Sequence, residues 1–328
     1  MAAGGTRAVV AALAANTGIA VTKFAAWALT GSASMLAEAI HSVADAGNQG
    51  LLLVGGKRSQ REATDEHPFG YGRERYIYAF IVSIVLFSLG GLFALYEAYH
   101  KFHELADGHG GDGLLTGDWR QYVPSIVLGL AIVMEGLSFR TAVVEGNKVR
   151  AGKSWWQFIR SAKAPELPVI LLEDFAALVG LTVAFVSVGL ALITENLYFD
   201  VLGSAVIGAL LVVVAIVLAI EVKSLLLGES ATRESVERMR RGIEATEGVQ
   251  RIIHMKTLHM APEELLVAVK VAVEPVALAG DVAALIDGIE QNLRSVEPMA
   301  TSIYIEPDIW RDDYVRAERP PIPDAPSH

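Results

Sequence analysis

A histidine and two carboxylates occur close together in a stretch of chain that is otherwise apolar. Residues 37–49 read AEAIHSVADAGNQ and contain Glu38, His41 and Asp45. Because His41 and Asp45 are four residues apart, a helix would stack them on one face. An imidazole nitrogen and a carboxylate oxygen from adjacent turns form half of a four-coordinate site for a divalent metal such as zinc. Glu38 is either a further member of this group or a partner that orients it.

A second acidic pair occurs far along the chain, again among apolar residues. The stretch VILLEDFAALVG contains Glu173 and Asp174. Two neighbouring carboxylates in an apolar environment repel each other unless a cation or protons intervene. Together with His41 and Asp45, these residues predict a metal or proton site shared by two helices. The open alternative is a His–Asp hydrogen bond that only ties two helices together.

The elements that must carry these residues are long apolar windows. The chain has 328 residues, of which 52% are hydrophobic and 20% are charged. A bilayer core about 30 Å thick is crossed by about 20 apolar residues of helix. Six windows of that length lie at about 8–29, 33–55, 76–99, 122–144, 167–193 and 197–222. They predict an α-helical membrane protein with six transmembrane helices.

Basic residues are concentrated in alternate connections between these windows. The connections between the second and third windows and between the fourth and fifth windows are rich in Lys and Arg, and the other connections are not. Because Lys and Arg stay on the cytoplasmic side, both termini are expected in the cytoplasm. We expect no cleavable signal peptide, and we expect a bacterial inner membrane as the location.

The chain changes character after residue 227. Helical spacing, two alternating strands, helical spacing again and a last strand predict a small α+β domain of the αββαβ, ferredoxin-like type. The expected domains are 1–227 in the membrane, 228–310 as a cytoplasmic dimerisation domain, and 311–328 as a flexible Pro-rich tail. The part from residue 228 carries 11 Lys plus Arg against 18 Asp plus Glu, which argues against nucleic acid as a partner.

Two features that the sequence lacks exclude certain kinds of site. Cysteine is absent, which excludes disulfides, thiolate catalysis and cysteine-based zinc sites. A metal would therefore be bound by nitrogen and oxygen atoms. No HExxH motif occurs, so we do not expect an enzyme or a catalytic cofactor.

Three stretches of the chain look like signatures of one known family. GSASMLAEAIHSVADAGNQGLLLVG, HPFGYGRERY and FDVLGSAVIGALL resemble segments of the cation diffusion facilitators, and most closely the branch of the zinc transporter 9 type. The resemblance covers nearly the whole chain. It implies six transmembrane helices, a cytoplasmic αββαβ domain that forms a homodimer, and a transport site made by a pair of residues in each of the second and fifth helices.

The resemblance assigns ligands residue by residue. It implies that His41 and Asp45 are ligands and that Asp174 is a third. The usual first ligand of the fifth helix falls on Ile170, which cannot bind metal, so Glu173 is the expected replacement. Adjacent residues point about 100° apart on a helix, so Glu173 and Asp174 reach one ion only if the helix is distorted or the ion lies between them. Asp174 is the firmer of the two assignments.

The expected activity follows from these ligands. Metal binds deprotonated His and carboxylate, so binding releases protons and protonation expels the ion. We expect proton-coupled efflux of Zn²⁺ by alternating access, with Mn²⁺, Fe²⁺ or Co²⁺ as alternative substrates. The expected partners are the divalent ion, protons, the lipid bilayer and a second copy of the chain. A non-transporting membrane scaffold or a metal sensor is the alternative.

Several charged residues lie outside this scheme. Lys23 in the first window either snorkels to the interface or pairs with an acid on a neighbouring helix. We interpret Glu97, Glu135, Glu145 and Glu221 as interfacial or helix-pairing residues. We interpret His254 and His259 as surface histidines, because an offset of five points them to opposite faces of a strand.

Overall fold

The computed structural model describes residues 3–30, 33–107 and 122–311. The described residues form two compact units. The first contains the residues up to Glu229 together with Met260–Pro262, and the second contains Ser230–His259 and the residues from Glu263 onward. The expected Pro-rich tail lies almost entirely outside the described residues.

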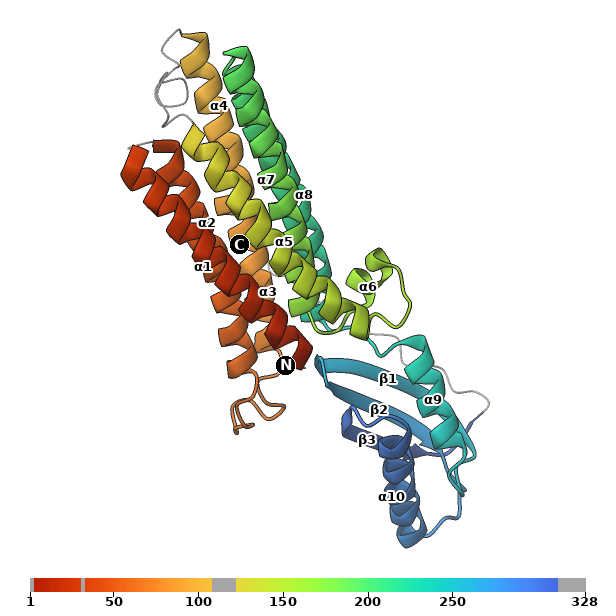
Figure 1. The fold of residues 1–328 in the computed structure, drawn as a ribbon. Helices are drawn as coiled ribbons and strands as arrows, with labels where there is room; N and C mark the ends of the chain where they lie inside the picture. Colours follow the sequence, from red (N-terminus) through yellow and green to blue (C-terminus); the bar gives the residue numbers. More distant parts are fainter. Residues whose placement is uncertain (1–2, 31–32, 108–121, 312–328) are drawn as a thin grey trace, which may run out of the picture. The chain divides into compact units, whose positions relative to one another are not determined.

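The first unit is a bundle of long helices (Figure 1). Its elements are α1 (Ala3–Thr30), α2 (Ala33–Arg58), α3 (Glu74–Val85), the π-helical segment η1 (Leu86–Leu92), α4 (Phe93–Ala106), α5 (Val123–Val149), α6 (Trp155–Ser161), α7 (Glu166–Thr194) and α8 (Tyr198–Leu227). The six apolar windows of the sequence correspond to α1, α2, the continuous α3–η1–α4 helix, α5, α7 and α8.

Five of these segments have the length and apolar character needed to cross a membrane. Among the described residues they are Gly5–Leu29, Glu74–Ala106, Val123–Val149, Glu166–Thr194 and Tyr198–Leu227. The helix α2 has 26 residues, which is long enough, but it is not one of the five. Its polar residues, including His41, Asp45, Asn48 and Gln49, lower its apolar character. The same residues that suggested chemistry thus make α2 the least lipid-like of the six helices.

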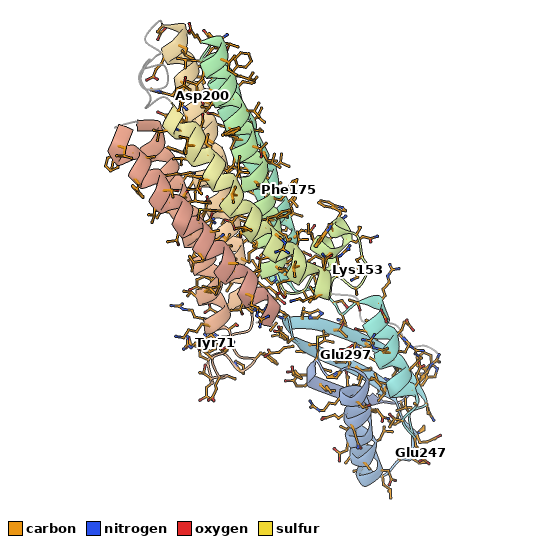
Figure 2. The ribbon with its side chains drawn as sticks, in the orientation of Figure 1. Tyr71, Lys153, Phe175, Asp200, Glu247 and Glu297 are labelled. Atoms are coloured by element: carbon orange, nitrogen blue, oxygen red, sulfur yellow. The ribbon has the colours of Figure 1, made fainter. Side chains whose placement is uncertain are left out.

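The bundle exposes many large apolar side chains and buries several polar ones in addition to its apolar core. Val21, Ile126 and Leu202 are each more than 60% exposed, and Phe175 on α7, labelled in Figure 2, is 46% exposed. The buried polar residues of the bundle include Asn16, Lys23, Asn48, Gln49, Glu135, Glu173 and Asp174. This arrangement is typical of a protein surrounded by lipid, in which ionisable groups face the interior. The chain is an integral membrane protein.

The third membrane-crossing segment is interrupted by the π-helical turn η1. A π-helical turn carries one extra residue and often lies at a functional site. Within it, a Cβ atom added at Gly91 would lie 2.6 Å from Val212 Cγ2 and 3.0 Å from the Val212 backbone nitrogen on α8. Gly91 therefore permits a backbone contact between η1 and α8 that no larger residue allows.

A buried ion pair fixes the start of α7 against α3. Arg75 and Glu166 are 4% and 2% exposed. Arg75 donates from Nε to Glu166 Oε1, and from Nη2 to Glu166 Oε2 at 2.9 Å. Such a two-pronged Arg–carboxylate contact fixes orientation as well as position. Glu173 follows Glu166 by two helical turns on α7, so this ion pair also helps to set the rotation of the helix that carries the second acidic pair.

The short helix α6 lies in the connection that the sequence analysis treated only as a basic loop. The Ser154 side chain accepts a hydrogen bond from the Gln157 backbone at 3.2 Å, and the Gln157 side chain accepts one from the Ser154 backbone at 3.1 Å. This reciprocal capping box is a signal for the start of a helix, and it was present in the sequence.

The second unit has the predicted order of helix, strand, strand, helix, strand. Its elements are α9 (Arg233–Glu244), β1 (Arg251–Ala261), β2 (Glu264–Ala272), α10 (Ala279–Val296) and β3 (Ala300–Asp308). The strand order is β1-β2-β3, and β2 pairs with β3 in parallel, with Val269 opposite Ile305. Two residues connect β1 to β2, which is typical of an antiparallel hairpin, so the sheet is mixed.

One hydrophobic core holds this second unit together. Alternate residues of β2, from Leu265 to Val271, pack against Met239 and Ile243 of α9 and against Leu285, Ile289 and Leu293 of α10. Both helices therefore cover the same face of the sheet. His259 on β1 is only 3% exposed, so its interpretation as a surface histidine is wrong. The fold as a whole is that of an α-helical membrane protein with a small C-terminal α+β domain.

Candidate functional site

His41 and Asp45 are stacked on one face of α2. His41 Nε2 lies 3.7 Å from Asp45 Oδ2, and their side chains are 25% and 18% exposed. The four-residue spacing thus produces the expected contact between imidazole and carboxylate. The side chain of Glu38 lies outside the described side chains.

Glu173 reaches α2 from α7. Its two carboxylate oxygens accept hydrogen bonds from the side-chain amides of Asn48 and Gln49, each at 3.0 Å. The Gln49 side-chain oxygen in turn accepts from Asn16 of α1 at 3.3 Å. A chain of buried hydrogen bonds therefore connects α1, α2 and α7 at the level of the acidic pair, and it fixes the position of the Glu173 carboxylate.

Asp174 points toward a different helix. Its Oδ2 accepts a hydrogen bond from Ser138 Oγ of α5 at 2.7 Å, and the residue is 1% exposed. Its Oδ1 is buried and has no hydrogen-bond partner within the described part of the chain. The two neighbouring carboxylates thus diverge, as the 100° rotation per residue requires: Glu173 contacts α2 and Asp174 contacts α5.

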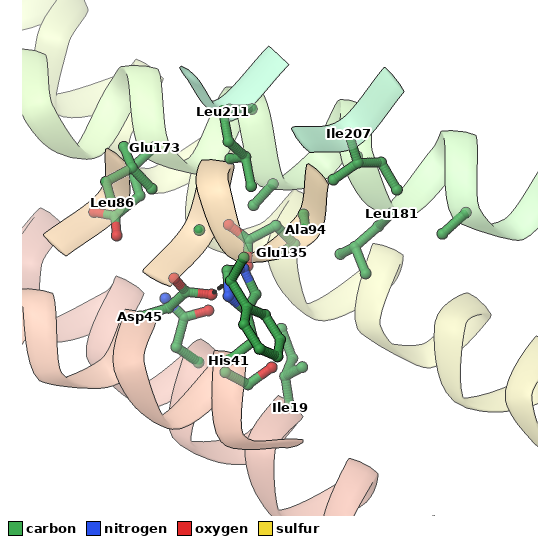
Figure 3. Close-up of a pocket in the computed structure, with 18 of the residues that line it drawn as sticks. Ile19, His41, Asp45, Leu86, Ala94, Glu135, Glu173, Leu181, Ile207 and Leu211 are labelled. Atoms are coloured by element: carbon green, nitrogen blue, oxygen red, sulfur yellow. Dashed lines mark ion pairs between the residues drawn. The ribbon is translucent and has the colours of Figure 1, made fainter. Parts of the chain in front are cut away.

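A cavity of about 100 Å³ lies inside the bundle (Figure 3). This space is large enough for an ion with several water molecules. Its polar lining includes His41 and Asp45 of α2 and Glu173 of α7, while Leu86, Leu181, Ile207 and Leu211 provide apolar wall. Asp174 is not among the residues that line it. Three of the four predicted ligands therefore share one cavity, and the fourth, Asp174, does not line it.

Three further charged residues line the same cavity, namely Lys23, Glu97 and Glu135. Glu135 of α5 is 1% exposed and Lys23 of α1 is 3% exposed. Glu135 interacts electrostatically with Asp174, with Asp45 and with Lys23. Of the two interpretations of Glu135, the interfacial one is therefore wrong, whereas the helix-pairing one agrees with its interaction with Lys23 of α1. Lys23 does not snorkel to a membrane surface, and its interaction with Glu135 agrees with the other interpretation, an acid on a neighbouring helix. Figure 3 shows Glu135 among the lining residues together with the ion pair of His41 and Asp45.

The carboxylates in and beside this cavity make it attractive to cations. Glu173 interacts electrostatically with Asp45, Asp174 and Glu135. Asp45 belongs to α2 and Glu135 to α5, whereas Glu173 and Asp174 are adjacent residues of α7. Repulsion among carboxylates in a medium of low dielectric constant is relieved when a cation or protons bind. The arrangement can thus hold a divalent cation or exchange it for protons.

The described side chains do not form a ready-made metal centre. Among the described side chains, which do not include that of Glu38, no three from His, Asp or Glu lie close enough together to hold one ion. The amides of Asn48 and Gln49 hold the Glu173 carboxylate, and Ser138 holds Asp174. A shared ion would therefore require side-chain rotations that exchange these hydrogen bonds for metal ligands.

The fold and cavity define a class of protein, namely a polytopic helical membrane protein with an acid-lined cavity within its bundle. Comparison with protein families agrees with this class. Residues 9–227 match the cation efflux transmembrane domain. This match covers well over half of the chain, and the chain belongs to the cation efflux family, the cation diffusion facilitators.

Individual relatives are similar over most of the chain. The human "Proton-coupled zinc antiporter SLC30A9, mitochondrial" is 36% identical over 241 residues, which are 71% of this chain and 40% of that protein. "Metal tolerance protein C4" of Arabidopsis thaliana is 29% identical over 71% of this chain and 49% of its own length. "Magnetosome protein MamB" of Magnetospirillum gryphiswaldense is 24% identical over 55% of this chain and 58% of its own length. The matched region spans less than half of the SLC30A9 and C4 proteins.

Proposed function

We propose that this protein exports divalent metal cations, with Zn²⁺ as the main substrate, in exchange for protons. The observation that carries this proposal is the single cavity that His41, Asp45 and Glu173 line within the membrane-spanning unit. Membership of the cation efflux family and the printed name of the human relative, a proton-coupled zinc antiporter, support the same substrate and coupling. No catalytic step is part of this proposal.

The proposed site uses His41, Asp45, Glu173 and Asp174 as metal ligands. His41 and Asp45 need no change of helix position, because they already face one cavity. Glu173 lines that cavity, and Asp174 would enter it by exchanging Ser138 for the ion. One imidazole with three carboxylates binds Zn²⁺ but is harder than a site with two histidines, so Mn²⁺, Fe²⁺ and Co²⁺ are the competing substrates.

Proton exchange follows from the ligand chemistry. A carboxylate or an imidazole that binds a metal has given up its proton, and a proton that returns weakens the metal site. When the cavity opens to the two sides in alternation, this competition converts inward proton flow into outward metal flow. His41 is the proposed coupling residue, because its imidazole nitrogen binds either a proton or the metal.

Orientation, location and assembly are also part of the proposal. The basic connections support a cytoplasmic position for both termini and for the C-terminal α+β domain, where a homodimer would form. A bacterial inner membrane is our proposal from the sequence, whereas the printed names of the vertebrate relatives place them in mitochondria. Membrane fractionation and cross-linking in the native cell test these points.

Ion flux in proteoliposomes tests the function. The wild-type chain should move Zn²⁺ and protons in opposite directions, and Mn²⁺, Fe²⁺ and Co²⁺ in the same assay would rank the substrates. Asp45→Asn and Asp174→Asn should each abolish metal-dependent proton flux, because each removes a proposed charged ligand. Asp287→Asn is the matched control: Asp287 is an exposed residue of α10 and does not line the cavity, so this variant should retain transport.

The alternative functions give different results in the same assay. A scaffold or a metal sensor would show no flux for any metal, and wild-type flux in either Asp variant would contradict the proposed ligands. An electrode or a dye that follows protons separates antiport from metal movement alone.

A further inference from the structure

Lys23 has an unusual position for a lysine. It lies on α1 with Asn16 and Ile19, and all three line the cavity that contains His41, Asp45 and Glu173. These residues are spaced i, i+3 and i+7, which is one face of a helix. The Lys23 residue is only 3% exposed, so its ammonium group is inside the bundle rather than at a surface.

A buried ammonium group requires compensation. An isolated charge in a bilayer is expensive, and such residues pair with opposite charges and face the interior or a cavity. Lys23 interacts electrostatically with Glu135 of α5, which is itself 1% exposed and lines the same cavity. The cavity thus contains a basic side chain of the protein beside the carboxylates that attract a metal.

We propose that Lys23 is an affinity-limiting residue of the cavity, because its ammonium group, which lines the same cavity as Glu135, opposes the binding of a divalent cation. This inference rests on the proposed function and extends it to the release step. Transport requires binding that is strong enough for entry and weak enough for release. The carboxylates of the cavity attract a divalent ion, and a positive charge on α1 weakens that attraction.

Removal of Lys23 and removal of Glu135 should change the affinity for a divalent cation in opposite directions. Removal of Lys23 leaves Glu135 as an additional uncompensated negative charge, so a divalent cation should bind more tightly. Removal of Glu135 leaves Lys23 as an uncompensated positive charge, so the cation should bind more weakly. Removal of both removes no net charge, so binding should return toward the wild-type value.

A purely structural role predicts something else. If the pair only tied α1 to α5, each single variant would lose stability and metal binding together, because one charge would be left buried without compensation. Neither single variant would bind metal more tightly than the wild type. Tighter metal binding by the Lys23 variant therefore distinguishes the proposed role from damage to the fold.

The experiment uses the full chain in detergent and in proteoliposomes. Isothermal titration with Zn²⁺ gives the Kd of the wild type, Lys23→Met, Lys23→Arg, Glu135→Gln and the double variant Lys23→Met with Glu135→Gln. We expect Lys23→Met to lower Kd about tenfold, since repulsion between one unit charge and a nearby divalent ion weakens binding by about that factor or more. Lys23→Arg keeps the charge and should stay within about twofold of the wild type.

Transport measured on the same variants completes the test. Lys23→Met should lower KM and lower the maximal rate, because the ion binds more tightly and leaves more slowly. Unchanged or weaker Zn²⁺ binding in Lys23→Met, or a double variant that is weaker than both single variants, overturns the inference. A wild-type chain that neither binds nor transports Zn²⁺ refutes the proposed function itself, which separates the two failures.

Discussion

At the scale of single residues, the structure separates the two acids that are neighbours in the sequence. Glu173 accepts two hydrogen bonds from α2, at 3.0 Å each, and Asp174 accepts one from α5 at 2.7 Å. Each carboxylate therefore connects α7 to a different helix. Glu173 thus has a structural role, as a hydrogen-bond acceptor between helices, in addition to its proposed role as a metal ligand. Measurements of stability and of metal binding separate the two roles.

The stability of Glu173 variants should reveal the structural role. Glu173→Ala leaves the buried amides of Asn48 and Gln49 without their acceptor, so the free energy of unfolding should fall by about 1–3 kcal/mol. Glu173→Gln keeps one acceptor oxygen and should lose less stability while it loses the charge. Thermal unfolding in detergent compares the two variants, and equal stability of Ala and Gln at this position would contradict the hydrogen-bonding role.

Pairs of charged residues were predictable from the sequence, whereas single ones were not. His41 and Asp45 were recognisable because a four-residue spacing has a direct geometrical meaning on a helix. Glu135 and Lys23 each stand alone in their helices, and periodicity does not say toward which neighbour a single residue points. The position of Asn16, seven residues before Lys23, was a usable signal, since both are polar and lie on the same helical face.

At the scale of secondary structure elements, the third membrane-crossing segment is the unusual one. Its π-helical turn η1 places Gly90 in the cavity wall and Gly91 against α8. A Cβ atom added at Gly90 would have its nearest neighbours, Leu211 and Leu86, at 3.4 Å and His41 Cε1 at 3.5 Å, whereas one at Gly91 would overlap with Val212. There is thus room for a Cβ atom at Gly90 but not at Gly91.

The two glycines form a matched pair of variants. Gly91→Ala should destabilise the protein by about 1–3 kcal/mol, because the backbones of η1 and α8 must move apart. Gly90→Ala should change stability by about 1 kcal/mol or less. Thermal unfolding of both variants in the same detergent tests the contact, and a Gly91→Ala variant as stable as Gly90→Ala would show that η1 and α8 are not packed this closely.

The helices themselves were largely predictable, but their local irregularities were not. Long apolar windows identify helices because length and apolar character are what a bilayer requires. The turn η1 has no signal in the apolar pattern, since Leu, Phe, Ser and Gly all fit a regular helix as well. The helix α6 was not predicted, although Ser154 and Gln157 have the spacing of a capping box, because its seven residues are too few for helical periodicity to stand out.

At the scale of the whole molecule, the C-terminal unit has its own core and an ionic cluster on its sheet. Lys270 on β2 lies 2.9 Å from both Glu306 and Asp308 on β3. Hydrogen bonds to Glu306 and Asp308 raise the pKa of Lys270 above its usual range. The hydrogen bond from Lys270, with one from the Ile309 backbone, lowers the pKa of Asp308 below its usual range.

These pKa shifts predict a pH dependence for the stability of the unit. Asp308 should contribute stability above its unfolded pKa of about 3.9, and this contribution is lost as pH falls through the lowered folded pKa. Lys270 should contribute below its unfolded pKa of about 10.4, and this is lost as pH rises through the raised folded pKa. Stability should therefore be level between these limits and fall on both sides.

Chemical denaturation of residues 230–311 across this pH range checks the prediction. Lys270→Met removes the main cause of the Asp308 shift, so the loss of stability on the acid side should become smaller. Lys256→Met, at an exposed position of β1, is the matched control and should keep the wild-type profile. The same acid profile in wild type and Lys270→Met would contradict the role of this cluster.

The order of elements in this unit was predictable, because alternation in β2 and helical spacing in α9 and α10 are strong signals. The burial of His259 was not predictable from the sequence. Its neighbours along β1 are only partly buried, and the strand has no regular alternation.

The polar character of α2 has a consequence for how the protein is made. A helix that carries His41, Asp45, Asn48 and Gln49 partitions poorly into lipid by itself. Its partners Asn16 and Glu173 belong to α1 and α7, and α7 is synthesised more than a hundred residues later. During translation, α2 is therefore expected to enter the bilayer as a hairpin with α1. The side-chain amides of Asn48 and Gln49 then lack the Glu173 carboxylate as their acceptor until α7 has been synthesised.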